Sequence, residues 1–540
     1  MTTSTCTAKE RYTQIAVNRE HYLRTFRMCA ALTVPHLMPP EGWTPGKELR
    51  RPAQSDGARG VNSLATKYLL GLLPTNIPNF KLEFPNIIGS LKAAAQGDIA
   101  KAKMAKANEQ LKANLAKIPR EALTYTSTFL HRPKIFESFK HVICGGNNLL
   151  WMMMSGDIRS IPLSKYCVLR DELGKPIEII IEDKISAANL PPKLKGMFLK
   201  LSGQPNAEKL LRESSEDKGD SPQEPHTIYT YAKWNHATQR YRMVREYMET
   251  EVPDTESIYK EEDFPLVPLA FARSDGQDYG NSLVNDYIGV LMSLEAIAQA
   301  EATLAIAMSD FRYAIHPASG MRARDFMNTP IHSAVDVDPN HIKAITADKY
   351  GDLNAIANSK ASLQREFGSA FLVFTSVARD AERVTAEEIR MMVQMLDEAQ
   401  GGQYTALSGD FQMPYTRYQL RLVKKFAKVD INKHRSNGIR PKLITGIEAL
   451  GQNSEASQVI TFFQALGGIF GEAEVARRTN VDVVGARLGG NFNLDTDGFF
   501  RSQEELDAEA QAQAADEQNR AAVGPIINQA GGLLKQANEA

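Results

Sequence analysis

The sequence predicts an α+β fold that is mainly helical, and three features of the chain support this prediction. Segments with apolar residues at helical spacing occupy much of the first 140 residues and much of the chain after residue 280. Between them, residues 160–272 contain short runs rich in β-branched and aromatic residues, which favour strands. The length of 540 residues, of which 43% are hydrophobic, allows sizeable cores and predicts about three or four modules.

The N-terminal part predicts a succession of helices. Residues 9–33 carry apolar positions at helical spacing, and residues 61–74 carry a wider apolar stripe that ends at a proline. The Ala/Lys-rich stretch 89–118 predicts an exposed helix, and a further helix is expected over 120–142. Two consecutive glycines then interrupt the helical pattern, and the apolar run after them, within 144–154, suits a buried strand.

The middle of the chain predicts a mainly β module over residues 160–272. The runs IEIIIED at 177–183, TIYTYAKW at 227–234 and RYRMVREYMETEV at 240–252 are typical of strands. The short polar stretch NHATQ separates the last two runs, which predicts a hairpin. The polar residues 212–225 predict a surface loop.

A long helix is expected over residues 281–310, because mostly apolar or small residues recur there at alternating steps of four and three. This heptad-like seam, which suits close packing against other helices, consists of Tyr287, Leu291, Leu294, Ala298, Glu301, Ala305 and Met308. Prolines and a glycine break the pattern afterwards, so residues 312–347 predict a compact non-helical insertion. A second helix is expected over residues 348–371.

A third helix is expected after a loop at residues 372–384. Thr385 as N-cap with Glu388 three residues later forms a capping box, which predicts where this helix begins. The helix is expected to continue, with a break at paired glycines, to about Val429. The tail 502–523 is rich in Ala, Gln and Glu, so it predicts a helix with little capacity to form a core, placed at a surface or in an assembly.

The charged residues are distributed unevenly, although the formal net charge is only −1. Residues 1–120 carry 18 Lys and Arg against 8 Asp and Glu, whereas the last fifty residues carry 9 acidic against 3 basic residues. A basic N-terminal part can meet nucleic acid or the acidic surface of a neighbouring subunit. We favour a solvated or inter-subunit role for this charge over nucleic-acid binding.

The four cysteines lie far apart in the sequence, at Cys6, Cys29, Cys144 and Cys167, and no CxxC pair occurs. A disulfide framework or a structural zinc site is therefore not expected, and a reducing compartment agrees with this cysteine usage. The N-terminus has no apolar segment typical of a secretory signal. No uninterrupted apolar run approaches the length of a membrane span, so the prediction is a soluble protein, cytoplasmic where it is made.

Motifs of known catalytic or cofactor sites are absent from the sequence. There is no Walker motif, HExxH, GxSxG or metal-spaced Cys/His cluster, so no catalytic, cofactor-binding or metal-ligating residue is assigned. Asp336 and Asp338 could form a carboxylate pair, but a turn before a proline explains them better. Glu387 and Glu388 are better explained as favourable charges on the first turn of a helix. The prediction is a protein that is not an enzyme.

Five stretches of the chain resemble, in the same order, portal proteins of short-tailed bacteriophages that carry their own RNA polymerase. They are GARGVNSLATKYLLGLLPTN (57–76), FKHVICGGNNLLWMMM (139–154), DGQDYGNSL (275–283), ERVTAEEIR (382–390) and TGIEALGQ (445–452). The resemblance extends from about residue 10 to 490, and ERVTAEEI is its most specific part. Beyond about residue 490 the resemblance fades.

The resemblance implies a structural protein, the portal or head-to-tail connector, that forms a ring, usually a dodecamer, at one vertex of the capsid. Double-stranded DNA would enter through the central channel, driven by the terminase large subunit, and would later leave by the same route. The implied partners also include the tail adaptor protein and the major capsid and scaffolding proteins. The implied location is the virion, after assembly in the host cytoplasm, with no membrane and no cofactor involved. The alternatives are another head-to-tail ring or scaffold-like component and, more distantly, an enzyme of unknown mechanism.

The family architecture implies a domain order along this chain. The assignments are a wing at 1–280, stem helices at 281–311 and 348–371, a clip at 312–347, a tunnel loop at 372–384, a long wing helix at 385–429, a crown at 430–495 and a C-terminal barrel or tail helix at 496–540.

The tunnel loop supplies the residues expected to meet DNA. Arg379 and Arg383 alternate there with Asp380 and Glu382. A translocating channel must not hold DNA tightly, because each basic side chain on a phosphate adds affinity that is multiplied over the ring. A few arginines balanced by acids agree with loose contact, although an ordinary solvated surface loop would look similar.

The clip supplies the residues expected to dock protein partners. Arg322, Arg324 and Asp325 lie in this insertion. The resemblance implies that the clip meets the terminase during packaging and the tail adaptor afterwards.

Overall fold

The fold is that of a computed structural model. It describes residues 6–44, 46–75, 78–83, 118–186, 189–201, 226–309, 312–330, 338–345, 350–373, 395, 398, 402–426, 440–443 and 462–471. The helix expected over 89–118, the loop 212–225, the capping box at Thr385 and the tail 502–523 lie outside or almost entirely outside these residues.

The chain divides into two compact units, Met1–Glu448 and Ala449–Ala540. The first unit contains both helices and strands, so the predicted α+β class is confirmed. In the second unit, the described residues 462–470 form a helix.

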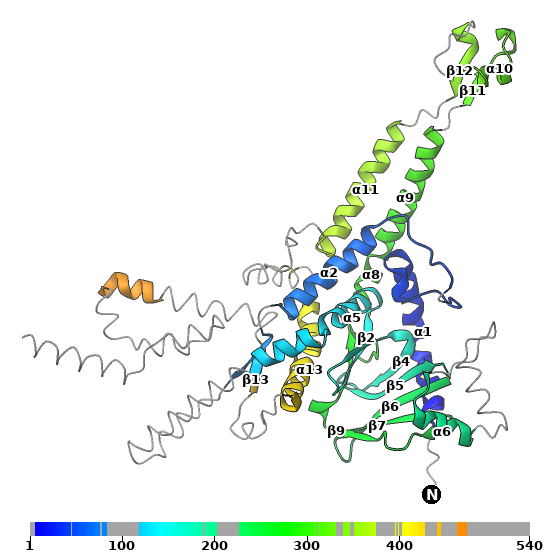
Figure 1. The fold of residues 1–540 in the computed structure, drawn as a ribbon. Coiled ribbons are helices and arrows are strands. Elements are labelled where there is room, and N and C mark those ends of the chain that lie inside the picture. Colours follow the sequence, from blue (N-terminus) through cyan, green and yellow to red (C-terminus); the bar gives the residue numbers. More distant parts are fainter. Residues whose placement is uncertain are drawn as a thin grey trace, which may run out of the picture. The chain divides into compact units, whose positions relative to one another are not determined.

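Three helices build one part of the first unit (Figure 1). α1 (Ala8–Leu32) begins with a capping box made by Thr7 and Glu10, and it packs against α5 (His131–Gly145). α2 (Asp56–Leu72) packs against α5 as well. These helices confirm the helical predictions for 9–33 and 61–74, although α2 starts five residues earlier than expected.

The single helix expected over 120–142 is wrong in one respect, because the chain forms two helices there. Residues 118–128 are helical, and α5 follows after a turn in which Leu130 has a φ of 50°. A non-glycine residue in the left-handed region cannot continue a right-handed helix, so the helix ends at this turn. Apolar spacing alone does not report such a break.

Two antiparallel sheets form the β part of the unit. The smaller sheet has β2 (Asn147–Met152) in its centre, flanked by β3 (Ile158–Pro162) and β10 (Leu266–Ala270). Every residue of β2 is buried, as expected for the apolar run after the paired glycines. α5 packs against β2 and β3.

The larger sheet has six strands and confirms the mainly β character predicted for 160–272. Its strands are β4 (Tyr166–Arg170), β5 (Pro176–Ile185), β6 (His226–Asn235), β7 (Arg240–Tyr247), β8 (Thr250–Glu251) and β9 (Ser257–Tyr259). They follow the order β4-β5-β6-β7-β8, with β9 also paired to β7. β6 and β7 form the hairpin predicted around NHATQ, with Asn235 opposite Arg240.

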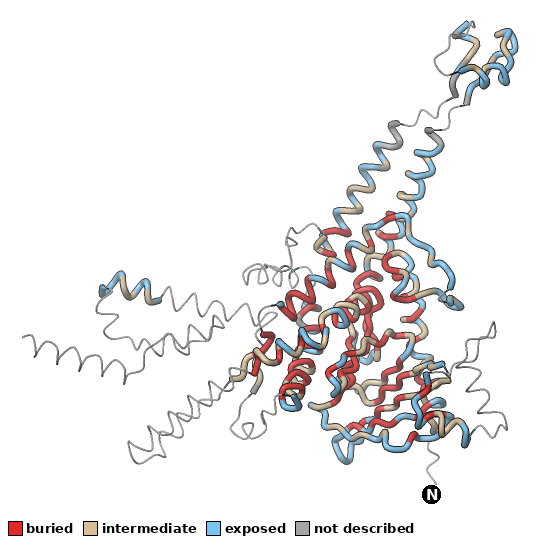
Figure 2. The backbone as a smooth tube through the Cα atoms, viewed as in Figure 1, coloured by how far each residue is buried: buried red, intermediate tan, exposed pale blue. Residues whose placement is uncertain are grey.

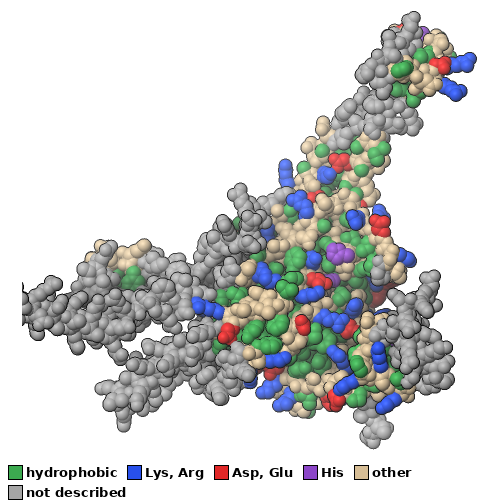
Figure 3. All heavy atoms as spheres, in the orientation of Figure 1, with side chains coloured by type: hydrophobic (Ala, Val, Ile, Leu, Met, Phe, Trp, Pro, Cys, Tyr) green, Lys and Arg blue, Asp and Glu red, His purple; other side chains and the backbone are tan. Residues whose placement is uncertain are grey.

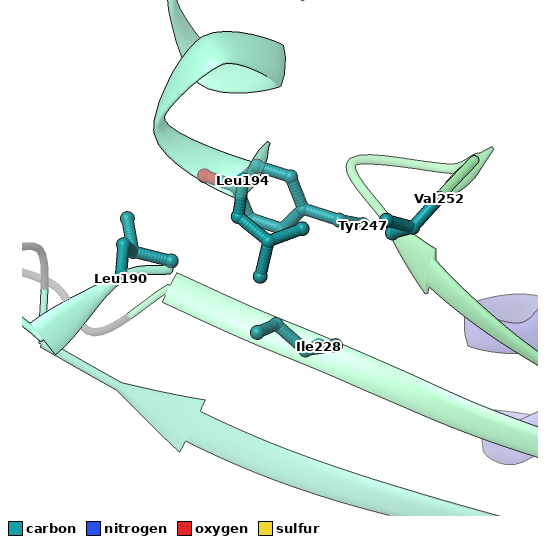
Figure 4. Close-up of a cluster of buried hydrophobic side chains, with 5 residues drawn as sticks. All are labelled: Leu190, Leu194, Ile228, Tyr247 and Val252. Carbon is teal, nitrogen blue, oxygen red and sulfur yellow. The ribbon is translucent and has the colours of Figure 1, made fainter. Parts of the chain in front are cut away.

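A short helix, α6 (Pro192–Leu201), covers one end of this sheet (Figure 4). The side chains that meet there are all apolar or aromatic: Leu190, Leu194, Ile228, Tyr247 and Val252. Tyr247 also donates or accepts a hydrogen bond at 2.7 Å with Nδ1 of His226, which satisfies its buried polar end.

α13 (Gln403–Phe426) completes the core with a face of buried aromatic residues. They are Tyr404, Phe411, Tyr415 and Tyr418. The helix contains Pro414 and contacts β10 and α2. A further strand pair, β1 (Phe80–Glu83) with β13 (Arg440–Leu443), lies antiparallel.

A buried histidine ties α13 to the turn between β2 and β3. His131 Nε2 lies 2.7 Å from the Gly156 carbonyl oxygen, and Nδ1 lies 3.0 Å from the Tyr415 hydroxyl. Because a carbonyl oxygen only accepts, Nε2 carries the proton and Nδ1 accepts from Tyr415 in the neutral ring. Burial lowers the pKa of His131, and burial lowers the pKa of His141 to about 3.

Acidification is therefore expected to destabilise the fold. An unfolded histidine binds a proton below about pH 6.5, whereas burial keeps His141 neutral well below that pH and lowers the pKa of His131 in the same direction. The stability that the neutral rings contribute is therefore present above pH 6.5 and is lost as the pH falls. For His141 the loss is about 1.4 kcal/mol per pH unit below 6.5. Urea unfolding at pH 7.5 and 5.5 measures this loss of unfolding free energy. In His141→Gln the loss between the two pH values should be smaller. Equal pH dependence in both proteins would contradict the assignment to His141.

Candidate functional site

The candidate site is a two-helix hairpin together with the residues that hold its base. α8 (Leu283–Asp286) leads into α9 (Ile288–Ser309), and α11 (Tyr350–Ala370) returns beside α9 (Figure 1). The expected helix over 281–310 is thus present but interrupted at Tyr287. Ser282 caps α8 by accepting a hydrogen bond from the Asn285 N–H at 2.9 Å.

Most of this hairpin is not buried. Beyond Leu294 on α9, and before Phe367 on α11, no residue whose burial is described is buried. Figure 2 shows both helices in tan and pale blue above a buried base. A hydrogen-bonded ion pair links the helices, in which Lys360 Nζ lies 2.6 Å from a carboxylate oxygen of Glu301.

The predicted seam of α9 is only partly used within the chain. Leu291 and Leu294 are buried, Ala298 and Glu301 are half-buried, and Ala305 is exposed. A second stripe at the same alternating spacing is exposed and made of small side chains: Gly289, Ser293, Ala296, Ala300 and Thr303. Side chains of this size allow another helix to approach closely.

α9 has little charge for an exposed helix. It carries no Lys or Arg. Among the described residues, its segment Ile288–Ile306 is long and apolar enough to cross a membrane by length and composition, and only 11% of it is buried. This segment differs from the expectation that no apolar run approaches the length of a membrane span. Both carboxylates within it, Glu295 and Glu301, bind groups of this chain, and Figure 3 shows mostly hydrophobic and uncharged atoms on the hairpin.

Glu295 anchors the basic loop before α2 to α9. Its carboxylate accepts hydrogen bonds from the Ala53 N–H at 2.8 and 3.0 Å and from the Gln54 N–H at 3.1 Å. Burial raises the pKa of this carboxyl, but the backbone hydrogen bonds outweigh that effect and hold the pKa of Glu295 below its usual range. Glu295 is one of two acids in the apolar α9, and a carboxylate in such a helix is a sequence signal that could have indicated this role.

The base of the hairpin joins two of the stretches that carried the resemblance. Asn147 Oδ1 accepts from the Gly280 N–H at 2.8 Å, and Asn147 Nδ2 donates to the Gly280 carbonyl at 2.8 Å. A Cβ on Gly280 would overlap the backbone oxygen of Phe271. Gly146, with a φ of 76°, lies against the backbone of Gly280 in the same way. Glycine is required at both positions because backbone, not side chain, fills the space.

Between the two hairpin helices, the chain forms a small separate group of elements. β11 (Arg312–Ile315) pairs antiparallel with β12 (Ile342–Ile345), and α10 (Ala323–Met327) lies between them in sequence. The expectation of a non-helical insertion is wrong for α10. Its five residues form one helical turn that a preceding glycine and later prolines do not prevent.

The three residues expected to dock protein partners come together on α10. Arg322 is its N-cap, Arg324 and Asp325 follow within the helix, and all three are exposed. Phe326 contacts Tyr313 of β11, with ring centroids 5.0 Å apart.

The residues expected to meet DNA cannot be placed. Arg379, Asp380, Glu382 and Arg383 lie outside the described residues. The described chain before them ends at Val373, just after α11.

Within the described part of the chain, no group of three His, Cys, Asp or Glu side chains could hold a metal ion.

Short 3-10 turns also occur among the described residues. They are Pro35–Leu37, Leu163–Lys165, Glu261–Asp263, Pro317–Ser319 and Pro339–His341.

Comparisons with known proteins identify relatives along nearly the whole chain. A family model described as bacteriophage head to tail connecting protein matches residues 5–499. The portal protein of Enterobacteria phage T3 is 25% identical over 530 residues, which cover 96% of this chain and 92% of that protein. The portal protein of Escherichia phage T7 is 25% identical over 506 residues, which cover 92% and 89%.

Solved structures were compared as well. A chain from the neck of a native gene transfer agent particle, computed with C12 symmetry, matches 76% of this chain and 86% of its own length at 12% identity and a TM-score of 0.30. That TM-score is too low to support a conclusion about the fold.

Proposed function

This chain belongs to the family of bacteriophage head to tail connecting proteins, and we propose that it forms a portal ring through which double-stranded DNA enters the capsid and later leaves. The resemblance to portal proteins found in the sequence is confirmed by the relatives from short-tailed phages. These relatives are named portal proteins. The ring, its position at one capsid vertex and its partners are part of the proposal.

The observation that carries the ring is the exposed α9/α11 hairpin, in which α9 carries only two charged residues. Two helices whose described residues bury no side chain beyond Leu294 on α9 and before Phe367 on α11 do not remove enough apolar surface from water to be stable alone. Copies arranged around an axis would cover this surface, because a head-to-tail interface sets one face of each copy against the opposite face of the next. The small stripe beginning at Gly289 would let neighbouring helices approach closely.

The composition of α9 agrees with a channel wall that DNA passes without being bound tightly. α9 has no basic residue, and its two acids are engaged with Lys360 and with the backbone at Ala53 and Gln54. Such a wall releases few counterions from DNA and so adds little affinity for it.

We assign the family's parts to this chain as follows, as part of the proposal. α9 and α11 form the stem, the elements between 312 and 347 the clip, residues 1–280 the wing, 372–384 the tunnel loop, 385–429 the long wing helix, 430–495 the crown and 496–540 the barrel. The boundary between the two compact units, at Glu448, falls inside the proposed crown.

Electron microscopy of the purified protein tests the proposal. Rings with a central hole, and packaging of DNA into capsids that contain them, are the expected results. Monomers under all conditions would contradict the ring. Rings that assemble into capsids but admit no DNA would favour the alternative, a head-to-tail or scaffold-like ring without a channel role.

Alanine substitution of Arg322, Arg324 and Asp325 is expected to leave rings intact but to weaken binding of the terminase large subunit at least tenfold. All three side chains are exposed, so their loss should cost the fold little, while it removes the charges that the terminase would meet. Pull-down with purified terminase measures the loss. A matched triple variant of exposed residues on the wing, Lys193, Lys200 and Glu256, should bind normally. Equal binding by both variants would move the docking surface away from α10.

Replacing Arg379 and Arg383 with glutamate is expected to leave ring assembly nearly unchanged but to reduce DNA packaging or retention. Exposed charges shift the free energy of unfolding by no more than about 0.5 kcal/mol, whereas two acids per copy would repel DNA around the ring. Packaged genome length and nuclease protection measure the effect. Normal retention would show that these arginines do not contact DNA, and loss of rings would assign them to an inter-subunit surface.

A further inference from the structure

α2 packs against the C-terminal end of α11, at the base of the hairpin (Figure 1). Gln364 Nε2 donates to a carboxylate oxygen of Asp56 at 2.8 Å. Gly60 lies so close to α11 that a Cβ on it would stand 2.6 Å from the Phe367 ring. Polar and apolar contacts thus hold the last turns of α11 against α2.

A buried lysine makes a third attachment, just beyond the last turn. Lys67 is 6% exposed, and its Nζ donates a hydrogen bond to the carbonyl oxygen of Leu372. Carbonyls at a helix C-terminus carry partial negative charge, so a lysine amine is a favourable partner for them. Burial lowers the pKa of Lys67 to about 8, which leaves the amine mostly charged at neutral pH.

The chain at this helix end is in a conformation that its residue disfavours. Leu372 has a φ of 54°, in the left-handed region where glycine is preferred and a leucine side chain is strained. The Val373 N–H bonds to the Gly368 carbonyl at 2.8 Å, and the Leu372 N–H to Ser369 at 3.3 Å. A strained residue at a sharp helix end needs a contact that favours this conformation over continuing the helix or fraying.

We propose that Lys67 is a positioning residue that fixes where α11 ends and the direction in which the chain leaves it. It acts through the Leu372 carbonyl, from a helix some three hundred residues earlier in the chain. The consequence for DNA rests on the proposed function, in which the residues after Val373 include the arginines that meet DNA.

Lys67→Met, which keeps the length and removes the donor, tests the proposal in the assembled ring. Hydrogen–deuterium exchange of the Val373 amide is expected to speed up at least tenfold, and DNA retention is expected to fall. Adding Leu372→Gly should restore both, because glycine adopts the left-handed conformation without the lysine. A residue that only fills the core would not be rescued by this change in backbone preference. Lys165→Met, an exposed lysine, is the matched control and should change neither measurement.

Unchanged exchange at Val373 in Lys67→Met, or failure of Leu372→Gly to restore protection, would overturn the proposal. If Lys67→Met does not fold, the double variant decides: folding with a protected Val373 amide supports the proposal, and failure to fold makes Lys67 a general packing residue. The exchange measurement does not depend on DNA. It therefore separates failure of this proposal from failure of the portal function, which would appear as wild-type rings that package no DNA.

Discussion

Replacing Gly280 with alanine is expected to cost more than about 3 kcal/mol of unfolding free energy and to leave little folded protein. The added methyl group would overlap the Phe271 carbonyl, and backbone at the end of β10 cannot move aside as a flexible side chain can. The change would also disturb the paired hydrogen bonds between Gly280 and Asn147, which join α8 to the smaller sheet. Urea unfolding of the purified protein, with yield of soluble protein as a second measure, records the loss.

Gly409→Ala is the matched control for this prediction. Gly409 also lies in the first unit, within α13, but a Cβ there would meet nothing within 4 Å. Alanine is favoured over glycine in a helix by up to about 1 kcal/mol, so this variant should be unchanged or slightly more stable. If the two variants are similarly stable, the Phe271 backbone can move to admit the added methyl group, and the prediction for Gly280 is wrong.

Replacing Ala296 and Ala300 with arginine is expected to abolish rings while leaving the fold of each copy intact. Both alanines are exposed within one chain, so the change in unfolding free energy should stay within about 0.5 kcal/mol per site. In a ring, twelve or a similar number of copies would each force two long cations into a surface of small side chains. Size-exclusion chromatography with light scattering and electron microscopy measure the assembly.

Ala237→Arg, at the exposed turn between β6 and β7, supplies the same substitution on another surface. It should assemble like the unmodified protein. Rings formed by the double arginine variant would show that the small stripe of α9 faces solvent or the channel, and another face of the hairpin would then have to form the contact between copies.

The sequence by itself determined the features that repeat locally along the chain. Apolar spacing predicted the ends of α1 to within one residue and those of α2 to within five, and the β-branched and aromatic runs predicted the hairpin of β6 and β7 around NHATQ. The heptad-like spacing after residue 280 predicted α9, and prolines predicted that it would end before a separate insertion. Each of these patterns is formed by residues that are close together in the sequence, so it can be interpreted without knowing which distant residues it will contact.

Only the tertiary structure decided which distant residues meet. Asn147 and Gly280 are 133 residues apart, Ala53 and Glu295 are 242 apart, and Lys67 and Leu372 are 305 apart. Nothing in the spacing of either partner indicates the other, because each pair forms where separately folded elements pack. The spacing of apolar residues did not report the breaks at Leu130 and Tyr287 either, because it continues across both while the backbone there leaves the helical path.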